Sequence, residues 1–319
     1  MNSYWHNKRV AVTGGAGFIG SHVVQSLMDA GCSEIIIVRS RDYDLTKEEN
    51  CIRMLKEVHP SVVIHLAGLV GGIGANQAWP ADFFYQNLTM GTFLLDQSWK
   101  LGIEKFIGAG AGCGYPEHAP MPLKETSFWE GLPQEESAPY SLAKRLLHIQ
   151  SIAYYQQHGF VSILGIPGNV YGPFDSFDLE AGHVVPALIR KFTEAVERKD
   201  PEVVVWGTGK PTRDFVYAGD VATGLLLAGE QTNQPELVNI SSGVETSIKE
   251  LVETVAELTG FEGKIIWDSN RPDGQLRRCF DISKAQQDLG FKAKTDLKDG
   301  LSRTIAWFKE HRSEARLTI

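Results

Sequence analysis

Hydrophobic positions in the first half of the chain fall into short runs that alternate with longer amphipathic stretches. Short runs rich in β-branched residues predict strands, and apolar residues spaced three or four apart predict helices. Strands are expected at 9–13, 34–39, 62–66, 105–108 and 160–166, with helices at 18–30, from 46, at 80–102 and at 139–158. This alternation predicts an α/β fold of the Rossmann type, with a doubly wound parallel sheet covered by helices.

Three helix boundaries are expected from residues with a specific backbone preference. Gly31 is expected to end the first helix. Thr46 with Glu49, and Ser247 with Glu250, have the spacing of a capping box, so a helix is expected to begin at each.

The alternation becomes less regular beyond residue 167. Helices are expected at 183–198, 220–229 and 247–260, with strands at 203–206, 213–217 and 237–240. We expect residues 1–170, with a return at about 213–240, to form an NAD(P)-binding Rossmann domain. Residues 171–212 and 241–319 are expected to form a smaller α/β C-terminal substrate domain, with the ligand cleft between the two.

The composition is that of a globular, acidic protein. The chain has 319 residues, 43 % hydrophobic, and a formal net charge of -8 without a long run of Lys and Arg. A nucleic-acid partner is disfavoured, because phosphate contacts need clustered positive charge. No apolar stretch approaches the ~20 residues of a membrane span, residues 1–9 do not resemble a signal peptide, and the four cysteines form no CxxC pair. We expect a cytoplasmic protein with no metal site and no membrane contact.

A glycine-rich turn, GGAGFIG at residues 14–20, follows the first expected strand. In a dinucleotide-binding turn the first glycine permits the tight bend and the middle ones let the backbone approach a pyrophosphate. The last glycine lets the helix pack on the strand, with its N-terminus facing the phosphates. Because the turn lies between a strand and a helix of an alternating pattern, it predicts an NAD(P) site; the alternative is a merely structural turn.

The end of the second expected strand carries basic residues. NAD-binding domains usually place Asp or Glu here to bind the adenosine ribose. This chain has Arg39 and Arg41, whose guanidinium groups suit a 2′-phosphate. NADP(H) is therefore favoured, NAD(H) is still possible, and the alternative is two solvated arginines in a loop.

Tyr140 and Lys144 lie one turn apart on one face of the helix after the fourth strand. An ammonium near a phenol favours the phenolate and lowers its pKa. The tyrosine could then exchange a proton with a sugar hydroxyl or ketone while a nicotinamide moves the hydride. The spacing alone proves little, because Tyr4 and Lys8 share it. The position in the α/β pattern is what predicts a catalytic pair at Tyr140 and Lys144.

The glycine turn, LAG at 66–68 and the Tyr140/Lys144 pair together resemble the extended short-chain dehydrogenase/reductase superfamily. Further segments resemble the GDP-L-fucose synthase (GDP-4-keto-6-deoxymannose epimerase/reductase) group within it. They are VGGIGAN at 70–76, PADF at 80–83, CGYP at 113–116, NVYGP at 169–173, HVVPAL at 183–188, WGTG at 206–209, RDF at 213–215 and PDG at 272–274. The resemblance covers nearly the whole chain, and GDP-mannose 3,5-epimerases look similar.

This resemblance implies a role for each matching residue. Cys113 and His183 match the group's base and acid for epimerisation beside a ketone, which suits a thiol and an imidazole. Their alternatives are a small buried thiol and a histidine at a helix start. The remaining implied contacts are Gly14, Gly17, Phe18, Ile19, Gly20, Arg39, Arg41, Asp44, Leu45, Leu66, Ala67, Gly68, Tyr140, Lys144, Pro167, Asn169 and Val170 for the cofactor, and Asn169, His183, Val184, Lys191, Trp206, Arg213 and Arg278 for the nucleotide sugar. Relatives commonly form homodimers through the two long helices, here 80–101 and 140–158.

One position departs from the group. Relatives normally have Ser or Thr four residues before the position of Tyr115, where its hydroxyl binds the reacting sugar oxygen, whereas this chain has Ala111. Loss of such a donor commonly costs ~10²–10³ in rate. Another donor or a water could replace it, the chemistry could differ, or the enzyme could be altered or weakened.

These residues are consistent with three functions. The first is an NADPH-dependent reductase, with or without epimerase activity, acting on a GDP-linked 4-keto sugar. The second is a redox-neutral epimerase or sugar 4-dehydrogenase that retains its NAD(P) tightly. The third is a dinucleotide-binding protein without catalysis, which the intact Tyr140 and Lys144 disfavour.

Overall fold

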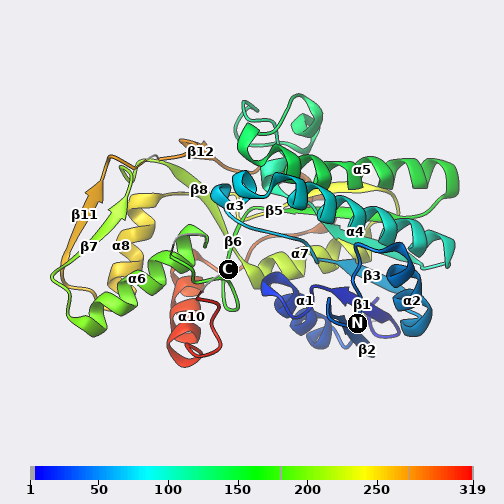
Figure 1. Cartoon of the computed structure of the whole chain (residues 1–319), viewed down its shortest axis with the longest axis horizontal. Helices are drawn as coiled ribbons and strands as arrows, with labels where there is room; N and C mark the ends of the chain where they lie inside the picture. The colour runs from blue at the N-terminus through cyan, green and yellow to red at the C-terminus, as the bar shows by residue number, and fades with distance from the viewer. Residues whose placement is uncertain (1–3, 180–181, 272, 318–319) are drawn as a thin grey trace.

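Six parallel strands form the central sheet, in the order β2-β1-β3-β4-β5-β9 (Figure 1). The computed structural model describes residues 4–179, 182–271 and 273–317. The strands are β1 (Arg9–Thr13), β2 (Glu34–Val38), β3 (Val62–His65), β4 (Lys105–Ala109), β5 (Ser162–Pro167) and β9 (Glu236–Ile240). The strand order reverses its direction of winding at β1 and β3, so the predicted doubly wound parallel sheet is confirmed.

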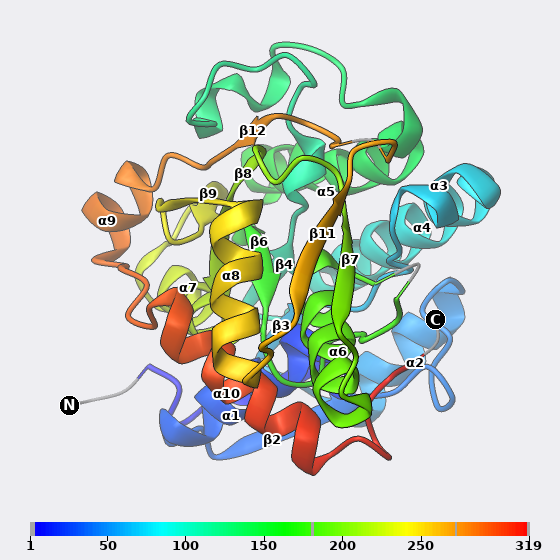
Figure 2. The same ribbon diagram turned by 90° about the vertical axis from the view of Figure 1, so that its left-hand side faces the viewer.

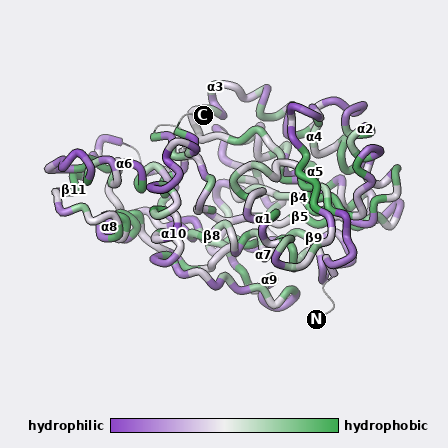
Figure 3. The backbone as a smooth tube through the Cα atoms, turned by 90° about the horizontal axis from the view of Figure 1, so that it is seen from below, coloured by the Kyte–Doolittle hydropathy of each residue, from purple (hydrophilic) through white to green (hydrophobic). Residues whose placement is uncertain are grey.

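Helices cover both faces of this sheet. In Figure 1, α4 (Pro80–Lys100) and α5 (Ala138–His158) lie side by side above it, and α1 (Phe18–Asp29) and α7 (Ala218–Gln231) lie below. The two cores divide alternate residues of β1, with Ala11 on one face and Val10 and Val12 on the other. Figure 3 shows the hydrophobic colouring around β4 and β5, with hydrophilic loops outside. Among the described helices, none is both long enough and apolar enough to cross a bilayer.

A smaller α/β unit stands at the carboxyl edge of the sheet, with its own apolar core. One sheet contains β10 (Glu245–Ser247), β8 (Thr212–Tyr217) and β12 (Arg277–Arg278), with β6 (Asn169–Tyr171) pairing to β8. A second sheet pairs β7 (Glu202–Trp206) with β11 (Lys264–Asp268), and both strands lie in front of the large sheet in Figure 2. Helices α6 (Val184–Arg198), α8 (Ile248–Thr259) and α10 (Leu297–Glu310) complete the unit. Phe192, Val255 and Phe308 are among the side chains in its core.

A late segment of the chain returns to the large sheet. Helix α9 (Ser283–Leu289) packs against α7 and β9. Ala285, Leu289 and Phe291 are buried in the same core as Val10 and Val12. The expected division, with 241–319 in the substrate domain, stays a prediction, but this segment contributes to the core of the Rossmann sheet. Its few apolar residues fit either core, so periodicity alone does not show which one they join.

Two of the three expected helix boundaries are confirmed and one is wrong. Gly31 follows α1 with a φ of +72°, and Ser247 caps α8 by accepting from the Glu250 N–H at 3.1 Å. Helix α2 (Glu48–Val58) instead begins two residues after Thr46, without a side-chain cap. The Thr46 hydroxyl donates to Asp44 Oδ1 at 2.6 Å, a local bond that competes with capping.

Asp214 links the two units of the fold, and its removal is expected to destabilise the protein. Its fully buried carboxylate accepts backbone N–H bonds from Ser242 and Gly243 at 3.1 Å and from Phe280 at 3.3 Å. We expect Asp214→Ala to cost at least about 3 kcal/mol, because it leaves several buried donors without an acceptor. The urea midpoint measures this, with Asp288→Ala on α9 as the control. Equal midpoints for the two variants would contradict the prediction.

Candidate active site

The glycine turn after β1 approaches the loop after β3 too closely for side chains. Gly14 has a φ of +70°, and a Cβ there would lie 2.8 Å from the Ala67 nitrogen. A Cβ on Gly20 would lie 2.0 Å from the Gly14 carbonyl oxygen. Helix α1 begins after Gly17, which has no side chain to cap it, so its cap residue leaves the N-terminal amides open to a ligand. This cradle fits a pyrophosphate group.

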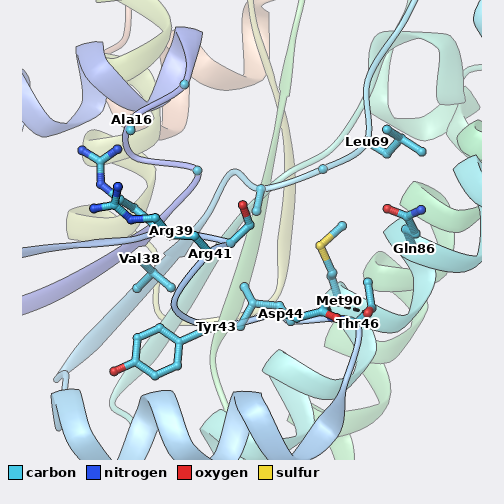
Figure 4. Close-up of a pocket in the computed structure, with 16 residues that line it drawn as sticks. Ala16, Val38, Arg39, Arg41, Tyr43, Asp44, Thr46, Leu69, Gln86 and Met90 are labelled. Carbon is cyan, nitrogen blue, oxygen red and sulfur yellow. Dashed lines mark hydrogen bonds between the residues drawn. The ribbon is translucent and has the colours of Figure 1, made fainter.

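A cleft of about 480 Å³ opens beside this turn (Figure 4). Eight residues expected at the cofactor line it: Gly14, Gly17, Arg39, Arg41, Asp44, Leu45, Ala67 and Gly68. Eight others also line it: Ala16, Val38, Ser40, Tyr43, Thr46, Leu69, Gln86 and Met90. Gln86 and Met90 lie one turn apart on α4, a spacing that could have indicated a shared face but not which face borders a cleft.

Arg39 and Arg41 stand at the outer end of the cleft. Figure 4 shows both guanidinium groups extending toward the turn that carries Ala16. The Arg41 side chain is 77 % exposed, and its ion pair with Asp42 is long, at 3.7 Å. Such a pair in water contributes little, so the guanidinium can turn toward an anionic ligand at low cost.

Other residues expected at the cofactor lie next to the cleft without lining it. Phe18, Ile19 and Gly20 form the first turn of α1, and Pro167 ends β5. Ile19, Leu66 and Val170 pack against the core of the large sheet. The Asn169 amide donates to the Asp214 carbonyl at 3.1 Å, between β6 and β8. The implied contacts of these residues stay predictions.

Tyr140 and Lys144 belong to the first turns of α5, and Lys144 reaches Gly68 at the inner end of the cleft. The Lys144 ammonium lies 3.4 Å from the point where a Cβ on Gly68 would stand, and burial lowers the pKa of Lys144 to about 8. Burial raises the pKa of Tyr140 far above its ordinary value. The expectation that the ammonium lowers the Tyr140 pKa is therefore wrong for this structure, because desolvation of the phenolate dominates.

Cys113 adds a thiol to the same region. It lies in η1 (Gly112–Gly114), a 3-10 helix of one turn after β4, and it is partly buried and forms no disulfide. A negative charge on its sulfur would interact with Tyr140, Lys144 and Arg278, which are all within electrostatic range. The sulfur of Cys113 and two cationic side chains, Lys144 and Arg278, are thus close together.

His183 lies on the smaller unit, immediately before the first turn of α6. Its Nδ1 is 3.5 Å from Oδ1 of Asp175, and its side chain is 56 % exposed. The hydrogen bond with Asp175 raises the pKa of His183.

The two arginines expected at the nucleotide sugar lie on β8 and β12. Arg213 and Arg278 are opposite each other in the two strands, Arg213 donates to the Gln275 carbonyl at 2.7 Å, and Arg278 donates to the Gly112 carbonyl. In the described part of the chain neither guanidinium bonds a carboxylate. Burial, then the neighbouring Arg278, lowers the pKa of Arg213. Such a pair suits a diphosphate.

A second pair of cationic side chains, Lys191 and Arg271, lies near the ring of Trp206. The Lys191 ammonium lies 5.9 Å from its ring, and the Arg271 guanidinium lies 4.8 Å from it. Arg271 was not expected at the site, because nothing in the sequence pairs it with Trp206.

Thr208 donates its N–H and its hydroxyl to the Asp273 carboxylate, each at 2.7 Å, which joins two of the motif segments. Pro272 of the PDG segment lies outside the described residues. Val184, the first residue of α6, is exposed.

A model of the NAD dependent epimerase/dehydratase family matches residues 10–241. The chain belongs to this family. Within the family it is 40 % identical to "Probable GDP-L-fucose synthase 1" of Oryza sativa subsp. japonica, over 95 % of this chain and 92 % of that protein. It is 32 % identical to the GDP-L-fucose synthase of Escherichia coli (strain K12), over 97 % of this chain and 99 % of that protein.

Solved structures agree with this family membership. A GDP-L-fucose synthetase from Naegleria fowleri bound to NADP superimposes with a TM-score of 0.90 at 28 % identity, covering 98 % of this chain and 95 % of that one. The expected resemblance and fold class are both confirmed.

Ala111 is the point where this family member lacks a polar group. It is buried, it precedes η1 with a φ of −140°, and Arg278 bonds the carbonyl of the next residue. A methyl group therefore stands where the resemblance expects a hydroxyl.

Gly20→Ala is expected to abolish dinucleotide binding, because the added Cβ collides with the Gly14 carbonyl and displaces the turn. Fluorescence titration with NADPH measures the binding, and a melting curve checks the fold. Gly74→Ala is the matched control, since nothing lies within 4 Å of its Cβ. Unchanged affinity in Gly20→Ala would show that this turn does not hold the cofactor.

Proposed function

We propose that this protein is an NADPH-dependent epimerase and reductase of a GDP-linked 4-keto sugar. The observation that carries the proposal is the meeting of Lys144, Tyr140 and Cys113 at the inner end of the dinucleotide cleft. The similarity to GDP-L-fucose synthases over nearly the whole chain supports the substrate class.

Two arginines support NADP(H) as the cofactor. Arg39 and Arg41 line the end of the cleft opposite Lys144, where the 2′-phosphate of NADP would lie. The solved relative from Naegleria fowleri binds NADP. Gly14 and Gly17 would hold the pyrophosphate, and Lys144 the nicotinamide ribose.

In the reduction, bound NADPH supplies the hydride to the ketone carbon. Tyr140 donates its phenolic proton to the ketone oxygen. The raised pKa of Tyr140 suits this role, because the phenol stays protonated at neutral pH. Lys144, with a pKa of about 8, remains mostly charged at pH 7 and stabilises the phenolate that forms.

In the epimerisation, Cys113 removes a proton from the carbon beside the ketone and His183 returns one from the opposite face. Arg213 and Arg278 would bind the diphosphate, while Lys191 and Trp206 would bind other parts of the nucleotide sugar. The buried guanidinium pair supports the diphosphate assignment, since it needs an anion to balance its charge.

Ala111 favours a second function, a redox-neutral epimerase that keeps its cofactor. Epimerisation uses Cys113 and His183, whereas the hydroxyl that Ala111 lacks would bind the oxygen that is reduced. A chain without this hydroxyl could still invert the carbons beside the ketone.

The protein is offered GDP-4-keto-6-deoxymannose and NADPH in D₂O, with absorbance and deuterium uptake followed together. NADPH oxidation in proportion to product supports the reductase, and Ala111→Ser is then expected to accelerate it. Deuterium uptake without NADPH oxidation supports the epimerase. Tyr140→Phe is expected to lower NADPH oxidation by about 10²-fold or more and to lower deuterium uptake less, because proton transfer at the carbon uses Cys113 and His183. Neither reaction in the wild type would contradict both functions.

Arg41→Ala is expected to raise the Kd for NADPH by about tenfold, the worth of one charge-assisted hydrogen bond, with little change for NADH. Isothermal titration measures both constants. Arg53→Ala on α2 is the control, because Arg53 does not line the cleft. A parallel loss of affinity for both cofactors would contradict the assignment of the 2′-phosphate site.

The protein is further proposed to be a cytoplasmic homodimer. Large apolar side chains are exposed on the two neighbouring long helices, with Tyr85 on α4 and Leu146 and Ile149 on α5. Burying such side chains against a second copy would remove apolar area from water. The wide separation of the four cysteines, which are all free, supports a reducing compartment.

A further inference from the structure

Asp175 is a buried carboxylate in the loop between β6 and α6. It is 3 % exposed. Its Oδ1 accepts the backbone N–H of Ser176 at 2.7 Å and lies 3.5 Å from Nδ1 of His183. Its Oδ2 is buried without a hydrogen-bond partner among the described residues. A buried carboxylate with a single backbone donor needs a positive partner, and His183 is the cation that the geometry offers.

The loop that carries Asp175 is held from both sides. Phe174 has a φ of +70°, a strained conformation for a residue with a Cβ. Arg316 donates to the Phe174 carbonyl at 2.7 Å, and its own carbonyl accepts the Phe177 N–H at 2.7 Å. Arg190 of α6 donates to the Phe177 carbonyl at 3.0 Å. The position of Asp175 is thus fixed relative to α6, the helix that begins after His183.

We propose that Asp175 is a positioning residue, whose carboxylate binds Nδ1–H of His183 and leaves Nε2–H available to the substrate carbon. This inference rests on the proposed function, in which His183 is the acid of the epimerisation. A carboxylate on one ring nitrogen fixes the tautomer and the ring orientation, as in the His–Asp pairs of hydrolases.

The epimerisation step moves one proton from the carbon to Cys113 and one from His183 to the carbon. The Cys113 thiolate removes the proton of the C–H bond beside the ketone, and the electron pair passes to the carbonyl oxygen as an enolate. Nε2 of the His183 imidazolium then gives its proton to the opposite face of the same carbon, and the enolate returns to the ketone. Asp175 keeps the Nδ1 proton in place throughout, so His183 ends as a neutral imidazole and Cys113 as a thiol.

The charges around His183 favour its protonated form. Asp175 raises the pKa of His183 through the hydrogen bond first and through its charge as well. The partial loss of hydration around the ring and the positive charge of Arg316 act in the opposite direction, as does the N-terminus of α6. An acid must be protonated to act, so the epimerisation rate falls as the pH rises through this pKa. Removing the Asp175 charge moves that fall to lower pH.

The test uses Asp175→Asn in the full chain, with NADP⁺ bound and GDP-4-keto-6-deoxymannose in D₂O, so that exchange occurs without hydride transfer. Deuterium uptake is measured against pH. Its alkaline limb is expected at lower pH than in the wild type, with an uptake at neutral pH between the wild-type value and that of His183→Gln. His183→Gln itself is expected to lose about 10²-fold. Glu197→Gln, a neutralised carboxylate on α6 that pairs with Arg312, is the matched control and keeps the wild-type profile.

A second measurement needs no Asp175 variant. The titration of His183 in the wild type is followed by NMR with ¹³C-labelled histidine, and its signal is identified by its absence in His183→Gln. A pKa above the ordinary 6.5 supports the pairing, and a pKa at or below it overturns the proposal.

The positioning role of Asp175 and the acid role of His183 are contradicted by different results. An unshifted pH profile in folded Asp175→Asn, with His183→Gln inactive in exchange, refutes the positioning role and leaves the proposed function intact. Full exchange activity in His183→Gln refutes the acid assignment in the proposed function itself.

Discussion

The close approach of two backbone loops at the carboxyl edge of the large sheet is the constraint on which the rest of the site depends. A Cβ at Gly14 would collide with the Ala67 backbone, and one at Gly68 would meet the Asn87 side chain at 2.8 Å. Because side chains are excluded there, backbone amides and the N-terminus of α1 face the cleft, and the Lys144 ammonium reaches its inner end. Burial in that place lowers the pKa of Lys144 and raises that of Tyr140, so both pKa values follow from the same tight packing.

Buried and partly buried cations dominate the inner half of the site. Lys144 is buried, and Arg213 and Arg278 are partly buried and donate to carbonyl groups. Holding positive charge where no carboxylate of residues 4–179, 182–271 and 273–317 neutralises it costs folding free energy. An anionic ligand recovers that energy on binding, which makes the site selective for diphosphates although the whole protein carries a net charge of -8. The overall charge and the local field have opposite signs, and only the local field acts on the substrate.

Sequence reasoning was most successful where one residue determines its own local structure. The strands of the large sheet, the turn at Gly14 and the cap at Ser247 each depend on a short segment, and so they could be predicted. The Thr46 cap failed because Asp44 competes for its hydroxyl. The fit of α9 to the large sheet, and the pairing of Asp175 with His183, depend on contacts between distant segments. Neither leaves a spacing that a single sequence reveals, and the direction of the Tyr140 pKa depends on burial in the same way.

The separation of the proton-transfer groups over different elements explains how a chain with Ala111 can keep part of its chemistry. Tyr140 and Lys144 belong to α5, whereas His183 and its partner Asp175 belong to the smaller unit, and η1 carries Cys113. The hydroxyl that Ala111 lacks would act on the ketone oxygen as charge develops there during hydride transfer. Carbon-proton exchange also passes through an enolate, but Tyr140 and the nearby Lys144 still face that oxygen in the proposed arrangement. Alanine at position 111 therefore slows the reduction more than the epimerisation. The ratio of the two rates measures how strongly this chain favours epimerisation over reduction.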